Sequence, residues 1–139
     1  MLFRSPLTVI TSSLDVAAIF AGDPQVQIAL TGGTWQHANR ALWGPAAVAM
    51  LQQCRADWAV PGACAIDARL GVSAPDEADA ALKRAMIACA RRTLILGDHS
   101  KLAGVAAFHV ADWSQVDTLL IDEPWPEGEA AGVPTRVAA

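Results

Sequence analysis

Several polar side chains in this sequence are of the types that hold an anionic or hydroxyl-bearing small molecule. Thr11, Ser12 and Ser13 follow an apolar run, and hydroxyls at the start of a helix combine with its free N–H groups to attract anions. Asp67 could accept hydrogen bonds from ligand hydroxyls, and Lys101 could reach an anion beyond a strand end. For the three hydroxyl residues, simple helix capping is the alternative interpretation.

Glycines and a spaced charge pair add to this set. Gly32 and Gly33 follow a second apolar run, where the missing Cβ would let a ligand approach the backbone, or would only permit a turn. Lys83 lies four residues after Asp79, and this spacing predicts an exposed helical ion pair worth about 0.2–0.5 kcal/mol. Neither feature is specific when taken alone.

No arrangement of nucleophile, base or metal ligands is evident. The three cysteines are far apart and lack zinc-site spacing, so we expect reduced thiols. The three histidines have no Ser, Cys or carboxylate partner at a motif spacing. The sequence therefore predicts no catalytic residues, no metal site and no cofactor.

The elements that must position these residues alternate along the chain. Apolar runs rich in β-branched residues indicate strands, and capping residues with a helical period indicate helices. We expect a loop at 64–73 and a variable loop at 34–40. The expected strands are 7–11, 26–31, 58–62, 93–97, 107–110, 118–121 and 134–137, and the expected helices are 14–20, 45–53 and 75–92.

The longest expected helix, 75–92, has a stripe of apolar residues, and its charges suit the helix dipole. Acidic residues occupy its first turns and Arg91 and Arg92 its last. The stripe leaves Asp79 and Lys83 off the apolar face. Its members are Ala78, Leu82, Ala85, Met86 and Cys89.

The alternation of continuously apolar strands with helices predicts an α/β fold with a mostly parallel sheet and helices on both faces. In such folds ligands bind at the carboxyl ends of the strands. The polar residues named above follow strand ends, so we expect them at this edge.

Composition excludes several classes of function. The chain has 139 residues, 53% of them hydrophobic and 17% charged, which is typical of a globular protein. A net charge of −4 without a basic stripe predicts no direct nucleic-acid binding. We find no signal peptide or membrane-span pattern, and therefore expect a cytoplasmic protein without membrane contact.

Five segments, in their order along the chain, resemble the C-terminal effector-binding domain of DeoR-family bacterial transcription regulators. The resemblance runs over residues 1–123, with 124–139 as a C-terminal extension that adds a last short strand to the same domain. The segments are LTVITSSL (7–14), the Gly-Gly to Gly-Pro stretch (32–45), RADWAVPGACAID (55–67), LGVSAPDEADAALKRAMI (70–87) and LILGDHSKLAG (94–104).

The resemblance implies a fold similar to sugar-phosphate isomerases and CoA transferases, and a sensor that binds a phosphorylated sugar or related metabolite. A helix-turn-helix domain would then control DNA binding in response. This chain contains no helix-turn-helix and lacks the family's opening strand, loop and helix, so we expect a truncated form. The implied ligand-binding residues are Thr11, Ser12, Ser13, Gly32, Gly33, Asp67, Gly71, Lys83 and Lys101.

Two other functions stay open. The chain could be an isomerase or deaminase of sugar phosphates, with Asp67 or Asp79 as base and Lys83 or Lys101 on the phosphate. It could also be a remnant that binds no ligand. The sensor interpretation predicts a protein that is not an enzyme. A missing opening strand would expose a sheet edge, from which we expect a homo-oligomer.

Overall fold

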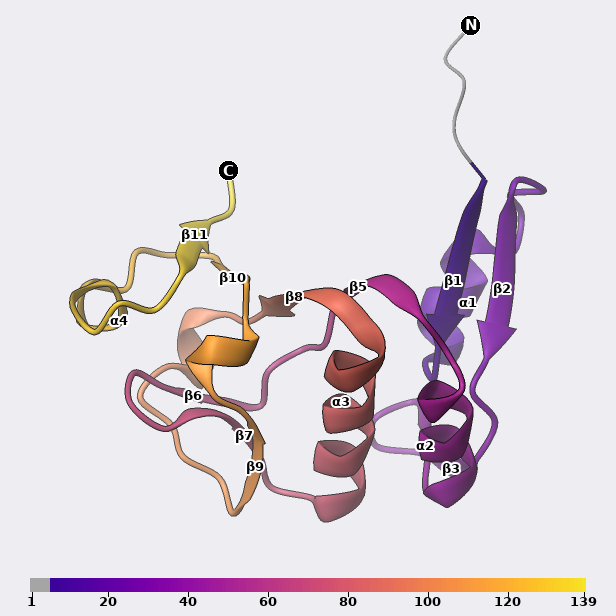
Figure 1. Cartoon of the computed structure of the whole chain (residues 1–139), viewed down its shortest axis with the longest axis horizontal. Helices are drawn as coiled ribbons and strands as arrows, with labels where there is room; N and C mark the ends of the chain where they lie inside the picture. Colours follow the sequence, from indigo (N-terminus) through magenta and orange to yellow (C-terminus); the bar gives the residue numbers. More distant parts are fainter. Residues whose placement is uncertain (1–5) are drawn as a thin grey trace, which may run out of the picture. The chain divides into compact units, whose positions relative to one another are not determined.

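The computed structural model describes residues 6–139, which fall into two compact units. Unit 1 extends to Leu51 and unit 2 runs from Gln52 to Ala139. Each unit has its own strands and helices (Figure 1), and each is described by itself.

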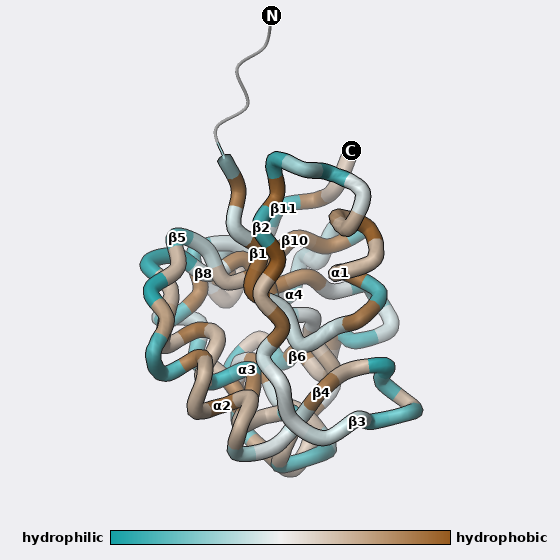
Figure 2. The backbone as a smooth tube through the Cα atoms, turned by 90° about the vertical axis from the view of Figure 1, so that its right-hand side faces the viewer, coloured by the Kyte–Doolittle hydropathy of each residue, from teal (hydrophilic) through white to brown (hydrophobic). Residues whose placement is uncertain are grey.

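Unit 1 is built on one strand–helix–strand crossover. β1 (Leu7–Thr11) pairs in parallel with β2 (Val26–Leu30), and α1 (Leu14–Phe20) connects them. Apolar residues predominate in both strands, although β2 also contains Gln27 (Figure 2). Ser13 caps α1, because its side chain accepts the N–H of Val16 at 3.2 Å. The predicted strands and helix are confirmed in this part of the chain.

A small hairpin follows where we predicted a variable loop over 34–40. β3 (Thr34–Gln36) and β4 (Ala41–Trp43) pair antiparallel, and α2 (Pro45–Gln52) begins at its proline as expected. The prediction of a loop was wrong because the two strands have only three residues each, and the polar residues of the turn between them hide the strand pattern. Arg40 closes that turn with a positive φ of 50° and stacks over Trp35 at 5.9 Å.

The main sheet of unit 2 is wholly parallel, which confirms the α/β class with a mostly parallel sheet. Its strand order is β11-β10-β8-β5. The last strand of the chain therefore lies beside β10. The bounds are β5 (Ala56–Ala59), β8 (Ala90–Leu96), β10 (Thr118–Ile121) and β11 (Thr135–Val137).

A second, antiparallel sheet occupies the segment that we predicted as a loop at 64–73. β6 (Ala65–Asp67), β7 (Gly71–Ala74) and β9 (Phe108–Ala111) pair in the order β6-β7-β9. The prediction was wrong because β7 is buried along its whole length and shows no alternation. Three short helices complete the unit: η1 (His99–Lys101), η2 (Trp113–Gln115) and α4 (Pro126–Ala130).

Helix α3 (Glu77–Cys89) packs against β5 and β8 (Figure 1) and is shorter than the predicted 75–92. Ala90 takes an extended conformation directly after Cys89, so the chain enters β8 without a connecting loop. Arg91 and Arg92 therefore lie in the strand and do not complement the helix dipole. The matched charges that we predicted at the C-terminal end of the helix are absent from α3.

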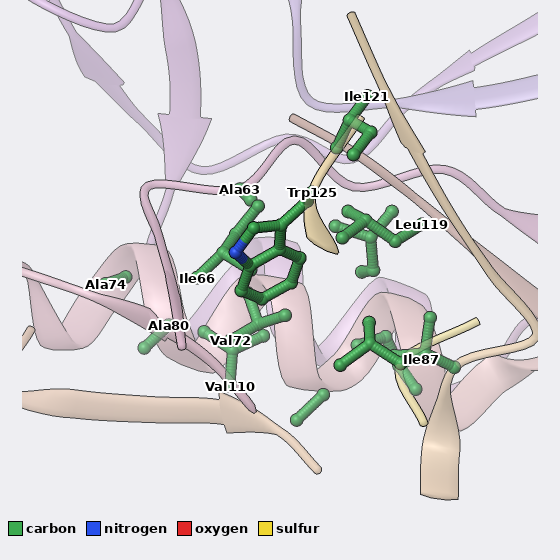
Figure 3. Packing of buried hydrophobic residues seen from close by; sticks show 14 residues of the cluster. Ala63, Ile66, Val72, Ala74, Ala80, Ile87, Val110, Leu119, Ile121 and Trp125 are labelled. Carbon is green, nitrogen blue, oxygen red and sulfur yellow. The ribbon is translucent and has the colours of Figure 1, made fainter. Parts of the chain in front are cut away.

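The hydrophobic core of unit 2 lies between the parallel sheet, α3 and the antiparallel sheet. Ile66, Val72, Ile95, Leu119 and Ile121 are fully buried in it. Trp125 packs among these aliphatic side chains (Figure 3) and meets Trp113 edge to face at 6.4 Å. Within residues 6–139, no helix has the length and apolarity needed to cross a membrane.

The two faces of β10 provide a test of this core. Leu119→Ala should lower the free energy of unfolding by about 2–5 kcal/mol, because it leaves a cavity in a closely packed core. Leu120→Ala, one residue along on the opposite face, removes a partly exposed side chain and should cost clearly less. Urea unfolding of both variants measures the difference, and equal losses would contradict the burial described for β10.

Candidate ligand-binding site

In unit 2 the polar residues gather at the carboxyl edge of the parallel sheet. Because α3 leads directly into β8, its N-terminal turns lie toward the end where β8 finishes. The segments after β5 and β8 also meet there, through bridges from Gly62 to Leu96 and from Ile66 to Leu102. This edge brings Cys64, the first turns of α3 and η1 together.

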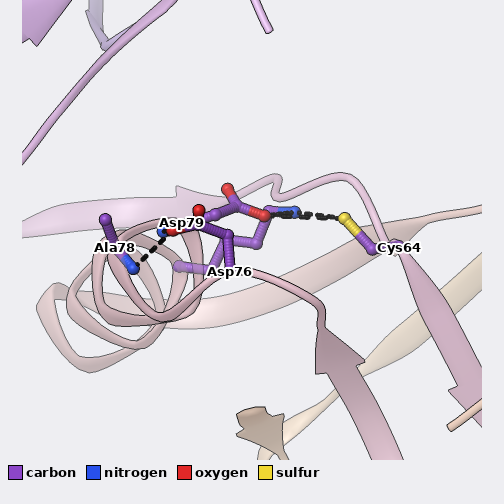
Figure 4. Close-up of polar contacts among 5 residues, drawn as sticks. Cys64, Asp76, Ala78 and Asp79 are labelled. Atoms are coloured by element: carbon purple, nitrogen blue, oxygen red, sulfur yellow. Dashed lines mark hydrogen bonds and ion pairs between the residues drawn. The ribbon is translucent and has the colours of Figure 1, made fainter. Parts of the chain in front are cut away.

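Lys83 and Asp79 form a buried ion pair at this edge. The Lys83 ammonium lies 2.8 Å from Oδ2 of Asp79, and the two side chains are only 13% and 10% exposed. Lys83 Nζ also donates to Cys64 Sγ at 3.3 Å, and Sγ lies 3.5 Å from the same carboxylate oxygen. Figure 4 shows Cys64 and Asp79 facing each other from a loop and from α3.

The prediction that Asp79 and Lys83 form an exposed ion pair is therefore wrong. The buried face of α3 consists of Asp79, Ala80, Leu82, Ala85 and Ile87, so it is rotated relative to the predicted stripe. The local reason is the cap of the helix. Asp76 accepts the N–H groups of Ala78 and Asp79, which starts α3 beside the sheet with Asp79 in its first, inward-facing turn.

Lys101 lies at the end of η1, half-buried, at the same edge. Within residues 6–139, its ammonium has no hydrogen-bond partner. Asp98 caps η1 through the N–H of Ser100, and the Ser100 hydroxyl also donates to this carboxylate. The two Ser100 donors, hydroxyl first, lower the pKa of Asp98, and the charge of Lys101 adds to the shift. Lys101 is thus a cation still able to bind an anion.

A second charged group follows the ends of β8 and β10. His99 Nδ1 lies 2.7 Å from Oδ2 of Asp122 and 3.8 Å from Oε1 of Glu123. The hydrogen bond with Asp122 raises the pKa of His99 and lowers that of Asp122, and the Glu123 charge raises the pKa of His99 further. These three residues could together ligate a cation, since their ligand atoms lie within 4.8 Å of one another. All three are exposed, and the His99–Asp122 pair already satisfies two of them.

Asp67 and Gly71 have structural roles in the β6–β7 hairpin. Oδ1 of Asp67 accepts the N–H groups of Leu70 at 2.7 Å and Arg69 at 2.8 Å, and these bonds lower the pKa of the carboxyl. Gly71 has a φ of +83°, and a Cβ there would overlap the carbonyl oxygen of Ala111. Their role in ligand binding stays a prediction.

In unit 1 the predicted site residues lie together after the paired ends of β1 and β2. The N–H of Thr31 donates to the Thr11 carbonyl, while Thr11 Oγ1 accepts the N–H of Ser13 at 3.0 Å. The Ser12 carbonyl accepts the N–H of Leu42 in β4. With Ser13 capping α1, these residues make local structure.

The two glycines of this turn differ from each other. Gly33 has a φ of +115°, and a Cβ there would come within 2.5 Å of the Trp43 carbonyl oxygen. Its missing side chain therefore serves the packing of the backbone. Gly32 has a φ of +69° with open space around it. Only Gly32 leaves room that a ligand could use, and this use stays a prediction.

Sequence reasoning missed Cys64 and the His99–Asp122 pair. Cys64 was expected to be an ordinary thiol, and no spacing along the chain connects it with Lys83. Its position just after β5, at the edge where ligands bind, was the available signal. His99 and Asp122 are joined only by the parallel pairing of β8 with β10, which a linear motif does not reveal.

Comparison with known proteins identifies relatives among transcription regulators. Residues 1–123 match the family model described as the DeoR C terminal sensor domain. The HTH-type transcriptional repressor CsqR of Escherichia coli is 32% identical over 123 residues, covering 88% of this chain and 47% of the relative. The HTH-type transcriptional repressor GlcR of Bacillus subtilis is 31% identical, covering 83% of this chain and 44% of the relative.

A third relative is the glycerol-3-phosphate regulon repressor of Escherichia coli. It is 29% identical over 126 residues, covering 91% of this chain and 50% of the relative. This chain thus spans about half the length of the curated relatives that it matches.

A matched pair of glycines tests the hairpin. Gly71→Ala and Gly132→Ala both place a Cβ at a φ of +83°, but only position 71 is sterically blocked. Gly132→Ala should cost about 1–2 kcal/mol of unfolding free energy from backbone strain, and Gly71→Ala about 1–3 kcal/mol more from overpacking. Chemical denaturation measures both, and similar losses would contradict a structural role for Gly71.

The His99–Asp122 pair should be visible in solution. We expect NMR titration to give His99 a pKa above the ordinary value for histidine, and Asp122→Asn to lower it, because the carboxylate stabilises the imidazolium. The raised pKa means that the pair stabilises the fold fully below the ordinary pKa of histidine, and this contribution is lost as pH rises through the His99 pKa. Glu127→Gln on α4 is the control, and an unchanged His99 pKa in Asp122→Asn would refute the pair.

Proposed function

The chain belongs to the DeoR C-terminal sensor domain family, and on that premise we propose that it binds a phosphorylated sugar or related metabolite at the carboxyl edge of the unit 2 sheet. The observation that supports this most is the pairing of two lysines of different character at one edge. Lys83 is fixed in place by Asp79, and Lys101 is a partly exposed cation. A phosphate dianion needs such donors.

The two lysines would have different tasks. Asp79 neutralises the charge of Lys83, so Lys101 supplies most of the electrostatic attraction. Lys83 uses two of its three N–H groups on Asp79 and Cys64, which leaves one donor for a ligand oxygen in a fixed direction. This rigidity favours recognition of a particular anion over general attraction.

The names of relatives support the choice of ligand class. They include a glycerol-3-phosphate regulon repressor and an L-fucose operon activator. We propose that ligand binding here controls the DNA affinity of a helix-turn-helix domain, as part of a cytoplasmic regulator. In this proposal the chain itself neither binds DNA nor contacts a membrane, and it acts as a homo-oligomer.

The enzymatic alternative has less support. A general base needs a carboxylate that is able to take up a proton. Oδ1 of Asp67 already accepts two backbone N–H groups, and Asp79 is held in an ion pair with Lys83. The two backbone N–H groups stabilise the charged Asp67 carboxylate, which opposes its protonation. Oδ2 of Asp79 contacts Lys83 and Cys64, so the protons within its reach belong to these side chains. We therefore propose a binding protein that is not an enzyme.

Thermal unfolding with a panel of ligands tests the proposed function. A phosphorylated ligand at 100 times its Kd should add about 2.7 kcal/mol of stability. The panel would contain glycerol 3-phosphate, hexose and pentose phosphates, the same sugars without phosphate, and inorganic phosphate. Lys101→Gln should reduce or abolish the shift, while Arg136→Gln, an exposed change on β11, should not.

Three outcomes would contradict this proposal. If no phosphorylated compound raises the unfolding temperature, the chain is better described as a remnant without a ligand. If a sugar phosphate is turned over at a rate that scales with protein concentration, the enzyme alternative is correct. Retained ligand shifts in Lys101→Gln would place the site elsewhere.

A further inference from the structure

We propose that Cys64 and Lys83 are a modification site, at which a peroxide drives formation of a reversible covalent bond between Sγ and Nζ. The two atoms are 3.3 Å apart and in direct contact. Asp79 touches both, at 2.8 Å from Nζ and 3.5 Å from Sγ. The three side chains thus place two nucleophiles and a proton acceptor together.

The backbones that hold this contact are well fixed. Lys83 lies in the second turn of α3, whose start is capped by Asp76. Cys64 stands between Ala63, whose N–H donates to the Leu96 carbonyl at 2.8 Å, and Ala65, the first residue of β6. Cys64 as a residue is partly exposed, so it is not sealed in the core. Fixed atoms in contact need little movement to form a bond.

Cys64 and Cys89 have different surroundings in the same unit. The Cys64 sulfur lies 3.3 Å from the Lys83 ammonium and 3.5 Å from an oxygen of the Asp79 carboxylate, so an amine is in direct contact with it. Burial raises the pKa of Cys89, whose thiol donates to the Met86 carbonyl at 3.2 Å. Cys89 is therefore an internal reference for an ordinary thiol.

The reaction balances with hydrogen peroxide as the named oxidant. The Cys64 sulfur attacks one peroxide oxygen, the O–O bond breaks, and sulfenic acid and water form. Asp79 then takes a proton from the Lys83 ammonium, and the neutral amine attacks the sulfur. The S–O bond breaks, and the departing hydroxide leaves as water with the proton held by Asp79. The nitrogen, still positively charged after the attack, then releases one proton to solvent and becomes a neutral S–NH link. Two equivalents of an added thiol reverse the step, giving free Cys64, free Lys83 and one disulfide of the added thiol.

The bond would remove the positive charge that Lys83 offers to a ligand and would leave its nitrogen with a single N–H. Resting on the proposed function, oxidation should therefore weaken phosphorylated-ligand binding. The covalent bond itself does not depend on any ligand. Its detection is thus a separate test from the thermal shifts described above.

Peptide mass spectrometry on the full chain tests the bond directly. Trypsin releases Cys64 in the peptide 56–69 and normally cleaves after Lys83. After peroxide treatment, we expect peptide 56–69 joined to 70–84, with no cleavage at Lys83 and a mass two hydrogens below the sum of the two peptides. Treatment with dithiothreitol should restore both free peptides.

Lys83→Arg is the matched variant, since it keeps a cation beside Asp79 but should not form the link. Trapping with a sulfenic-acid reagent should then label Cys64 in this variant, and should label Cys89 about tenfold more slowly. Circular dichroism confirms that the variant is folded, and Cys64→Ser should abolish the link while leaving the fold intact. Oxidised Cys64 that stays unlinked in the wild-type chain would overturn the proposal, as would equal oxidation of Cys64 and Cys89.

Discussion

The direct passage from α3 into β8 is the constraint on which the candidate site depends. Cys89 ends the helix and Ala90 starts the strand, so α3 and β8 must run in opposite directions along the same length of sheet. The N-terminal turns of α3 are thereby brought to the carboxyl edge, where η1 and the segment after β5 also arrive. Asp79 and Lys83 reach Cys64 for this reason, and not because of any local motif.

The burial of Asp79 and Lys83 has an energetic cost that their position offsets. Removing two charges from water is expensive unless they pair closely and their other hydrogen bonds are satisfied. The 2.8 Å ion pair and the Cys64 contact provide the pairing, and the positive end of the α3 dipole stabilises an acidic residue in the first turn. Such a pair is seldom a gain in stability over apolar packing. Its presence at the carboxyl edge is better explained by a need to hold an ammonium rigidly.

The sequence predicted the elements with strong local signals and missed those that depend on tertiary contacts. Strands β1 and β10 and helix α1 have the predicted bounds, because β-branched runs and the Ser13 cap act locally. The β6–β7 hairpin was missed because its strands are buried on both faces and its turn is closed by Asp67. The end of α3 was misplaced because Arg91 and Arg92 suit a helix terminus as well as they suit an exposed strand, where Arg92 stacks on Trp58 at 5.6 Å. For the site, residue types and strand ends were sufficient to name Lys83 and Lys101, whereas the partners of Lys83 required the fold.

The missing loop between α3 and β8 also limits where this unit can change during evolution. An insertion at residues 89–90 would have to be accommodated in the last turn of α3 or at the start of β8, which pairs with β5 there, so this side of the sheet has little freedom in length. The opposite side has an irregular segment, 97–107, which is anchored by η1 and by the bridge from Leu102 to Ile66, and a change in its length would displace the core strands less. The length of the chain can therefore vary more among homologues in segment 97–107 than at the junction of α3 and β8, which preserves the scaffold.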